Sequence, residues 1–241
     1  MKNTLCLLLL LSLSTSMVSQ DQLYKVVLYR AAPGMLQELI EAVKKDVDNY
    51  DVLGVKQPYL LRHSQGDHWD LMLIYPVESL EAYFSEGQQQ KRAQSKTLEK
   101  PYGHAFHNLL SYQEEAFVKG PATDVFDEAF KTNNFFHIEI FSALAGKQTE
   151  LLKQRESENR FYAHLNHPPN LIFTRVHGPS WDIFTIGAYK SLQAYADDGG
   201  VTPEMEDQAA KKAGFQGVAY IGSYLRALLL EHHDTLANKV D

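Results

Sequence analysis

Residues 69–83, WDLMLIYPVESLEAY, and residues 181–195, WDIFTIGAYKSLQAY, decide the fold, because they carry one pattern twice, 112 positions apart. Continued outward without a gap, this register aligns Tyr24–Phe84 with Phe136–Ala196 and gives 14 identical residues in 61 positions. Self-similarity at a fixed spacing indicates repeated structural units. The sequence therefore predicts two copies of one domain, at 20–118 and 134–241, the second with a C-terminal extension, joined by a linker at 119–133.

Each copy is expected to fold as strand, helix, strand, strand, helix, strand. Runs of β-branched and aromatic residues predict the strands, and apolar residues at helical spacing predict a helix after Pro33-Gly34. The predicted strands are 24–30, 59–63, 69–75 and 108–117 in the first copy, and 171–176, 181–186 and 218–229 after the opening strand of the second. Helices are expected near Ser79 and Ser191, and an additional helix after the Thr202 cap. This order predicts an α+β fold of two ferredoxin-like βαββαβ domains.

A ferredoxin-like sheet has helices on one face only, so its other face is apolar and needs a partner. Two copies in one chain supply that partner, and we expect the two sheets to pack together as an intrachain α+β barrel.

The strand order, the Pro33-Gly34 turn before an amphipathic helix and the repeated Trp-Asp strand resemble the dimeric α+β barrel superfamily. Its relatives include the NIPSNAP, EthD and antibiotic-biosynthesis monooxygenase families. The resemblance covers nearly the whole chain after residue 20. It implies the barrel fold, and an activity drawn from cofactor-free oxygenases, haem enzymes, small isomerases and proteins without an assigned reaction.

The N-terminal segment indicates where the protein is located, and the net charge limits which partners it can bind. Lys2, an apolar run from Leu5 to Val18 and a polar stretch after it are typical of a signal peptide, predicted at residues 1–19. We therefore expect export to the periplasm or the medium, no membrane span, and a mature chain without the single Cys6. A net charge of −7 disfavours nucleic-acid partners.

The first copy serves as a template against which polar replacements in the second become visible. Val27 and Lys25 correspond to Glu139 and His137, two candidate catalytic bases on one strand face. On the first helix of each copy, Val43 corresponds to Arg155. The expected ligand-binding residues are Arg155, Asn159, Tyr162, Phe173, Arg175 and His177, with an arginine holding a carboxylate or enolate oxygen. The alternative is a charged helix surface in which Glu139 simply pairs with an arginine.

No metal site and no cofactor are predicted. His104 with His107, and His232-His233-Asp234, offer metal-capable groups, but neighbouring strand residues point to opposite faces and neither group has a second matching pair. The Trp-Asp pairs at 69–70 and 181–182 are expected to be structural, because both copies have them.

The leading hypothesis is an exported barrel that binds a small organic molecule in a mostly apolar cavity, oriented by the polar cluster of the second copy. Whether it has catalytic activity stays open at this stage. One alternative is a cofactor-independent oxygenase or isomerase that removes a proton next to a carbonyl; another is an assembly module without a ligand. A homo-oligomer is compatible with each of these hypotheses.

Overall fold

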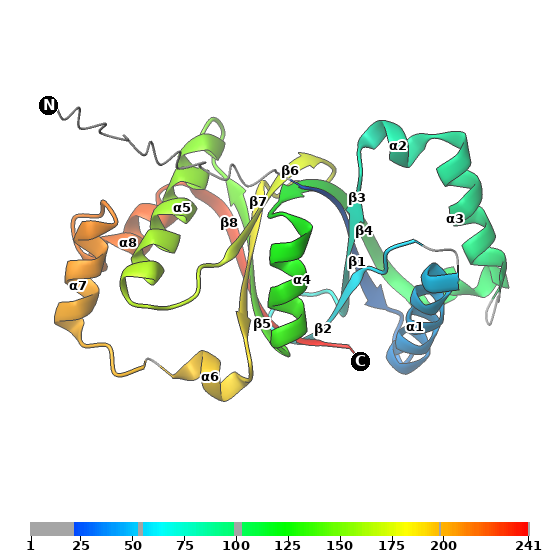
Figure 1. Ribbon diagram of the computed structural model, residues 1–241, viewed down its shortest axis with the longest axis horizontal. Coiled ribbons are helices and arrows are strands. Elements are labelled where there is room, and N and C mark those ends of the chain that lie inside the picture. Colours follow the sequence, from blue (N-terminus) through cyan, green and yellow to red (C-terminus); the bar gives the residue numbers. More distant parts are fainter. Residues whose placement is uncertain (1–21, 53–54, 99–102, 198, 241) are drawn as a thin grey trace, which may run out of the picture.

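The computed structural model describes residues 22–52, 55–98, 103–197 and 199–240 (Figure 1). The predicted signal peptide lies outside the described residues. Within them, eight strands form a closed barrel in the order β1-β3-β2-β8-β5-β7-β6-β4. The strands are β1 (Gln22–Ala31), β2 (Tyr59–Gln65), β3 (Leu71–Val77), β4 (Leu110–Gly120), β5 (Phe135–Ala143), β6 (Leu171–His177), β7 (Ile183–Tyr189) and β8 (Leu229–Lys239).

The helices lie outside the barrel or across one of its ends (Figure 1). They are α1 (Leu36–Val52), α2 (Leu80–Phe84), α3 (Glu86–Leu98), the 3-10 helix η1 (Gly103–Leu109), α4 (Thr123–Thr132), α5 (Gln148–His164), α6 (Leu192–Ala196), α7 (Pro203–Lys212) and α8 (Val218–Arg226). The predicted helix starts are confirmed: Ser79, Ser191 and Thr202 each accept a backbone N–H three residues ahead.

The predicted fold class is confirmed, and the barrel closes through two seams between the copies. Each copy has the ferredoxin-like strand order, β4-β1-β3-β2 and β8-β5-β7-β6, and the copies join where β2 pairs with β8 and β4 pairs with β6. Gly66 and Gly178, at φ +117° and +125°, let the two hairpins approach the last strand of the opposite copy. All edges are thereby paired, so a single chain completes the barrel.

The last strand of the second copy does not lie where the sequence predicted it. Residues 218–226 form helix α8, and the strand follows at Leu229–Lys239. Val118 pairs with Tyr24 and Ala237 pairs with Phe136, so the repeat offset has grown from 112 to 119 in this strand. The gapless register does not hold beyond the additional helix α7. The polar composition of β8 also gives little indication of a strand.

Buried aromatic and aliphatic side chains pack against one another in the interior of the barrel, where the sequence predicted a mostly apolar cavity. Tyr24, Phe136, Phe173 and Phe184 are fully buried there. One end is closed by α4, whose Phe126 stacks on Tyr59 at 3.9 Å between ring centroids and is itself fully buried. The segment predicted as a linker therefore includes a core helix, which is visible in front of the strands in Figure 1.

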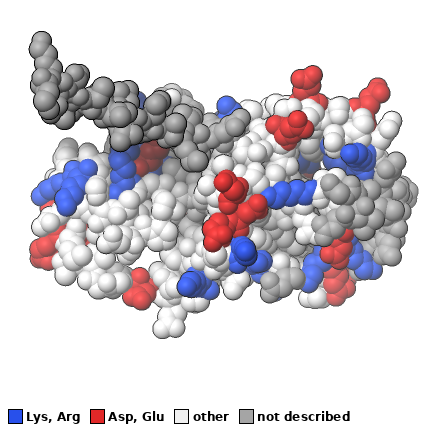
Figure 2. Space-filling view, in the orientation of Figure 1, with Lys and Arg blue, Asp and Glu red and all other residues white. Residues whose placement is uncertain are grey.

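Charged residues of both signs are scattered among uncharged ones over the face shown in Figure 2. Within the described residues, no helix has the length and apolar character needed to cross a membrane.

Candidate functional site

The outer face of the second sheet, toward α5, differs chemically from the same face of the first sheet. In the first copy this face is an apolar core that includes Val27, Val43 and Leu73. The corresponding residues of the second copy are Glu139, Arg155 and Thr185, at the constant offset of 112. All three are buried, with Arg155 only 2% exposed. The same backbone thus buries charge in one copy and hydrocarbon in the other.

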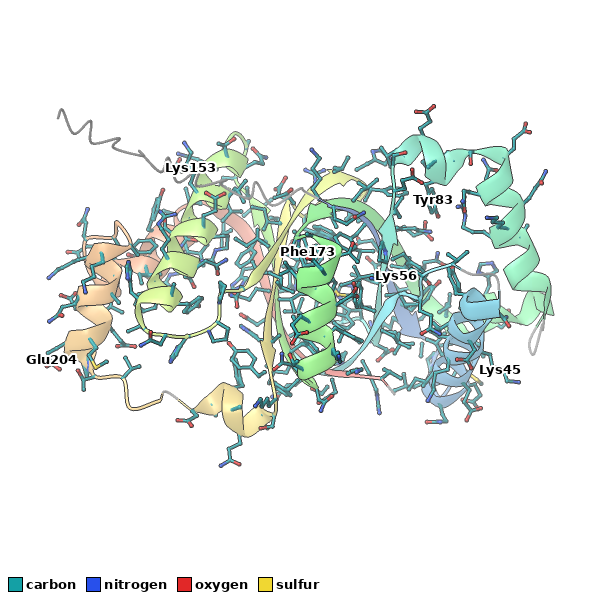
Figure 3. All side chains as sticks on the ribbon, viewed as in Figure 1. Lys45, Lys56, Tyr83, Lys153, Phe173 and Glu204 are labelled. Atoms are coloured by element: carbon teal, nitrogen blue, oxygen red, sulfur yellow. The ribbon has the colours of Figure 1, made fainter. Side chains whose placement is uncertain are left out.

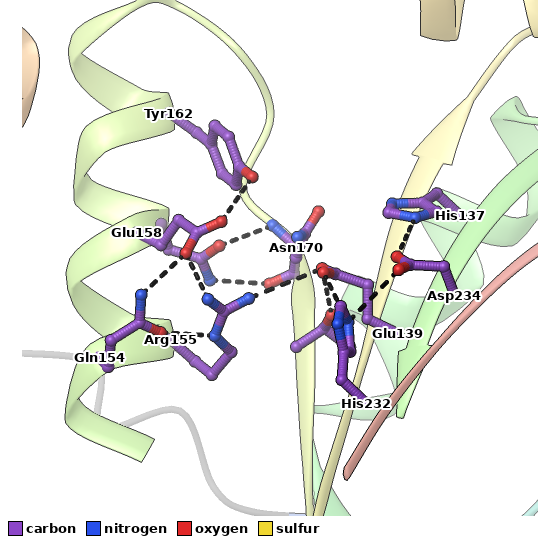
Figure 4. Close-up of polar contacts among 11 residues, drawn as sticks. His137, Glu139, Gln154, Arg155, Glu158, Tyr162, Asn170, His232 and Asp234 are labelled. Atoms are coloured by element: carbon purple, nitrogen blue, oxygen red, sulfur yellow. Dashed lines mark hydrogen bonds and ion pairs between the residues drawn. The ribbon is translucent and has the colours of Figure 1, made fainter. Parts of the chain in front are cut away.

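Arg155 is held in a network of α5 and β5 side chains (Figure 4). Its guanidinium ion-pairs with Glu158 one turn further on and lies 3.6 Å from Glu139 Oε2. Its Nε donates to Gln154 Oε1 at 2.7 Å, and its plane lies over the Phe141 ring at 4.6 Å. The buried cation is therefore fully partnered within the protein.

Beside this network, β5 and β8 bring together two histidines and two carboxylates: His137, Glu139, His232 and Asp234, called here the tetrad (Figure 4). His137 Nε2 lies 3.0 Å from Asp234 Oδ1, and His232 Nε2 lies 3.3 Å from Glu139 Oε1 and 3.7 Å from Asp234 Oδ2. The side chain of Glu139 is 11% exposed, whereas that of Asp234 is 58% exposed. The tetrad thus runs from a buried carboxylate to an accessible one.

The electrostatics of the tetrad follow from these contacts. Burial raises the pKa of Glu139, but the hydrogen bond with His232 and the charges of Arg155 and the histidines outweigh it, so the pKa lies below its ordinary value. The hydrogen bond with His137 lowers the pKa of Asp234. Burial lowers the pKa of His232, and the two carboxylates more than reverse this, so its pKa is raised.

The His137–Asp234 pair has a counterpart in the first copy, where Lys25 and Glu115 form an ion pair at 2.9 Å. Offsets of 112 for β5 and 119 for β8 make the two pairs equivalent. His232 corresponds to Gln113. An ion pair at this position is therefore a shared structural feature, and what distinguishes the second copy is the change to histidine together with Glu139 and His232.

Of the predicted catalytic residues, His137 and Glu139 lie on one strand face, as expected. Arg155 forms an ion pair with Glu139, and the alternative of a charged helix surface predicts the same pairing. Asn159 exchanges two hydrogen bonds with the backbone of Asn170 and so fixes the start of β6. Tyr162 donates to Glu158 at 2.9 Å, and burial raises its pKa.

Phe173, Arg175 and His177 are not part of this group. Phe173 lies among the strands behind α4 (Figure 3), stacked on Phe184 inside the barrel. Arg175 pairs with Asp182 at 2.6 Å, and His177 is exposed in the β4–β6 seam. Phe173 and Arg175 share the interior-facing parity of β6, whereas Glu139 points outward, so the sheet separates them from the tetrad. A register shift in the β4–β6 ladder falls between Arg175 and His177.

Sequence reasoning missed Glu158, and it considered His232 and Asp234 only as part of the run His232-His233-Asp234, which it set aside as a metal site. The sequence signal was His232-x-Asp234, two residues on one face of a strand, opposite His137-x-Glu139 on its neighbour. This pairing was not predicted, because the final strand was expected to end at residue 229.

The other residues considered in the sequence analysis, the His104/His107 pair and the two Trp-Asp pairs, lie outside the tetrad. The side chain of His104 lies outside the described residues, and the ring of His107 lies 6.3 Å from that of Phe106. The Trp-Asp pairs have the expected contacts: Trp69 is fully buried, and Asp70 and Asp182 accept backbone N–H groups at the ends of β1 and β5.

Two open clefts are lined mainly by residues of the second copy. One, of about 550 Å³, is lined by Ser157 of α5 and by aromatic residues of the α7–α8 region, including Phe215, Tyr220 and Tyr224. The other, of about 470 Å³, lies where α6 meets β5, β8 and the β2 end, and includes Phe135 and Leu192. The tetrad itself reaches solvent through the partly exposed His137, His232 and Asp234.

Neither a protein-family model nor a curated protein matches the sequence. Solved structures do. An anthrone oxidase-like protein superposes with a TM-score of 0.58 at 14% identity over 92% of each chain. A candidate monooxygenase from Fusobacterium nucleatum gives 0.53 at 12% identity over 92% of this chain and 93% of that one. A candidate chlorite dismutase gives 0.50 at 11% identity over 91% and 95%.

The fold, an α+β barrel of eight strands closed within one chain, is shared with these solved structures. At these identities the likeness establishes the architecture, and the residues of the tetrad are the basis for any statement about function.

Proposed function

We propose that the chain binds a small organic molecule on the outer face of the second sheet, with a polar group of the ligand against the tetrad. The observation that carries the proposal is the replacement of Val27 and Val43 by Glu139 and Arg155 on an otherwise equivalent scaffold. Burying an ion pair where valines suffice commonly costs stability. Retention of such groups beside two accessible histidines is typical of a functional site.

The charges favour an uncharged or cationic ligand. Glu139, Glu158 and Asp234 carry three negative charges against the one positive charge of Arg155, an excess that the two histidines offset only when they are protonated. A carboxylate ligand would be repelled. Arg155 is also buried and fully partnered, so we assign it to positioning Glu139, and the expected capture of a carboxylate or enolate by this arginine is withdrawn.

A second candidate function is proton transfer to and from the bound ligand, as in a cofactor-independent oxygenase or isomerase. The observation that favours it is His137, which is held by Asp234 at 3.0 Å and remains partly accessible. Of the two predicted bases, His137 is the better one, because the lowered pKa of Glu139 makes that carboxylate a weak proton acceptor. An oxygenase would agree with the names of two structures that share the fold.

The wider setting is proposed on sequence grounds. We infer export through the N-terminal segment, membership near the NIPSNAP, EthD and antibiotic-biosynthesis monooxygenase families, and homo-oligomer formation through surfaces other than the barrel seams.

The test is a mass-spectrometric survey of small molecules that copurify with the full chain, with His137→Gln, and with Lys25→Gln as the matched control in the first copy. We expect a molecule retained by the wild type and by Lys25→Gln and depleted in His137→Gln. The same profile in all three proteins would refute the assignment of the binding face. If the retained molecule is also converted, His137→Gln should lower the rate and Lys25→Gln should not.

A further inference from the structure

We propose that the tetrad is a binding site for one divalent transition-metal ion, with His137, Glu139, His232 and Asp234 as its ligands. The inference deepens the proposed function, since it names what the polar end of the same face holds. A bound ion would polarise an oxygen of the organic ligand, and a water on the ion would take over the proton-transfer role assigned to His137.

The strand register creates this arrangement. Glu139 lies directly opposite Asp234 on the antiparallel β5–β8 ladder, and Phe141 lies opposite His232. Each strand therefore contributes two ligands at positions i and i+2, which share one face. No loop is needed to assemble the site, so its geometry is as rigid as the barrel.

The spacing of the ligand atoms of three tetrad residues fits a metal ion, and His137 adjoins this group through Asp234. One ligand atom from each of Glu139, His232 and Asp234 lies within 4.8 Å of the other two. Two ligands bound at about 2.1 Å in a tetrahedral site are roughly 3.4 Å apart. The His232–Glu139 and His232–Asp234 distances of 3.3 and 3.7 Å bracket that value, and His137 Nε2 lies beside Asp234 at 3.0 Å.

Surrounding groups hold the ligands in place. Arg155 and Thr185 both contact Glu139 Oε2, which leaves Oε1 toward His232. The Phe141 ring stacks on His232 at 4.7 Å with an interplanar angle of 4°, and so fixes the imidazole orientation. Outer contacts of this kind tune metal sites. The excess of carboxylates over guanidinium also provides the negative charge that a divalent cation requires.

The ligand chemistry selects the class of ion. Two imidazoles favour zinc, iron(II), cobalt(II) or copper(II) over calcium and magnesium, which prefer sites made of oxygen alone. The equivalent positions of the first copy hold Lys25, Val27, Gln113 and Glu115, a set that cannot bind such an ion. The chain thus contains its own internal control.

The experiment is a titration of chelator-treated full chain with cobalt(II), followed by the visible absorption that distinguishes tetrahedral from aqueous cobalt. We expect one equivalent to bind. His232→Gln and Asp234→Asn, each checked for folding by circular dichroism, should weaken binding by about 10-fold or more. Gln113→Ala and Lys25→Gln, at the equivalent first-copy positions, should leave binding unchanged.

Absence of cobalt binding by the folded wild type would overturn the inference, as would binding that persists in the His232→Gln/Asp234→Asn double variant. The two proposals fail separately, because the survey of retained molecules is repeated on chelator-treated protein. A chain that keeps its organic ligand but binds no cobalt retains the proposed function alone. A chain that binds cobalt through the tetrad but no organic molecule retains the metal site alone.

Discussion

Arg155 and Glu139 depend on each other for burial at this site. Arg155→Val alone leaves the 11%-exposed Glu139 without its cationic partner, and we expect a loss of about 3–5 kcal/mol in the free energy of unfolding. Combining Arg155→Val with Glu139→Val restores both first-copy residues. The double variant should be as stable as the wild type or more so, as measured by urea denaturation.

The two valines of the double variant are the residues that the first copy already buries, Val27 and Val43. The first copy also carries an acidic residue, Asp46, at the position of Glu158. Glu158 keeps hydrogen bonds from Gln154 and Tyr162 in either variant. If the double variant were less stable than Arg155→Val, the ion pair would be structural and the stability argument for a functional face would fail.

At the scale of elements, α4 closes one end of the barrel. Phe126 is fully buried against Tyr59, Tyr24 and Phe173, whereas its neighbour Val125 is 48% exposed. We expect Phe126→Ala to cost about 3–5 kcal/mol of unfolding free energy. Val125→Ala, on the same helix, should change it by no more than about 0.5 kcal/mol. Equal effects in thermal denaturation would show that α4 does not close the barrel.

Asp127 of the same helix should make a small contribution to the free energy of unfolding that is lost at acid pH. Asp127 accepts hydrogen bonds from Lys56 and Tyr59; burial raises its pKa, but these partners lower it below 3.8 overall. Because the folded-state pKa is the lower one, the stabilisation is present above pH 3.8 and is lost as the pH falls through the folded value. Asp127→Asn should therefore cost stability at pH 6, at most about 1 kcal/mol at this half-exposed site, and the cost should shrink as the pH falls through the folded value.

The two hairpins are expected to be intolerant of any side chain at their glycines. A Cβ on Gly66 would meet the backbone of Asp234, and one on Gly178 the backbone of Glu115. Gly146 has a similar positive φ, +78°, with open space around it. Gly146→Ala should therefore cost about 1 kcal/mol from backbone strain alone. Gly66→Ala and Gly178→Ala should cost clearly more, and equal melting temperatures would contradict the close contact across the seams.

At the scale of the whole molecule, the barrel exists only when both copies are present. Separating them exposes the edges of β2 and β4 in one half, those of β6 and β8 in the other, and one apolar sheet face in each. A chain cut between Gly120 and Thr123 should yield halves that copurify and reassociate, and that aggregate when separated. A soluble, monomeric half with native circular dichroism would contradict this expectation, as judged by light scattering.

The sequence by itself determined the α+β class, the duplicated βαββαβ order and the helix caps, because these depend on local periodicity and on a repeat that survives in the residue types. It also identified Glu139 and Arg155, since a charge at a valine position is visible by comparing the two copies. The packed interior, the role of α4 and the shift of the last strand were decided by tertiary structure.

The candidate site shows the same division. His232 and Asp234 lie 95 residues or more from His137 in the chain, and only the β5–β8 register places them on one face. Conversely, Arg175 and Arg155 looked equivalent in sequence, yet the sheet puts them on opposite sides. Which face a strand residue occupies depends on strand position to within one residue, because the side-chain period is two. Pairing across the barrel fixes that position, and a single sequence does not.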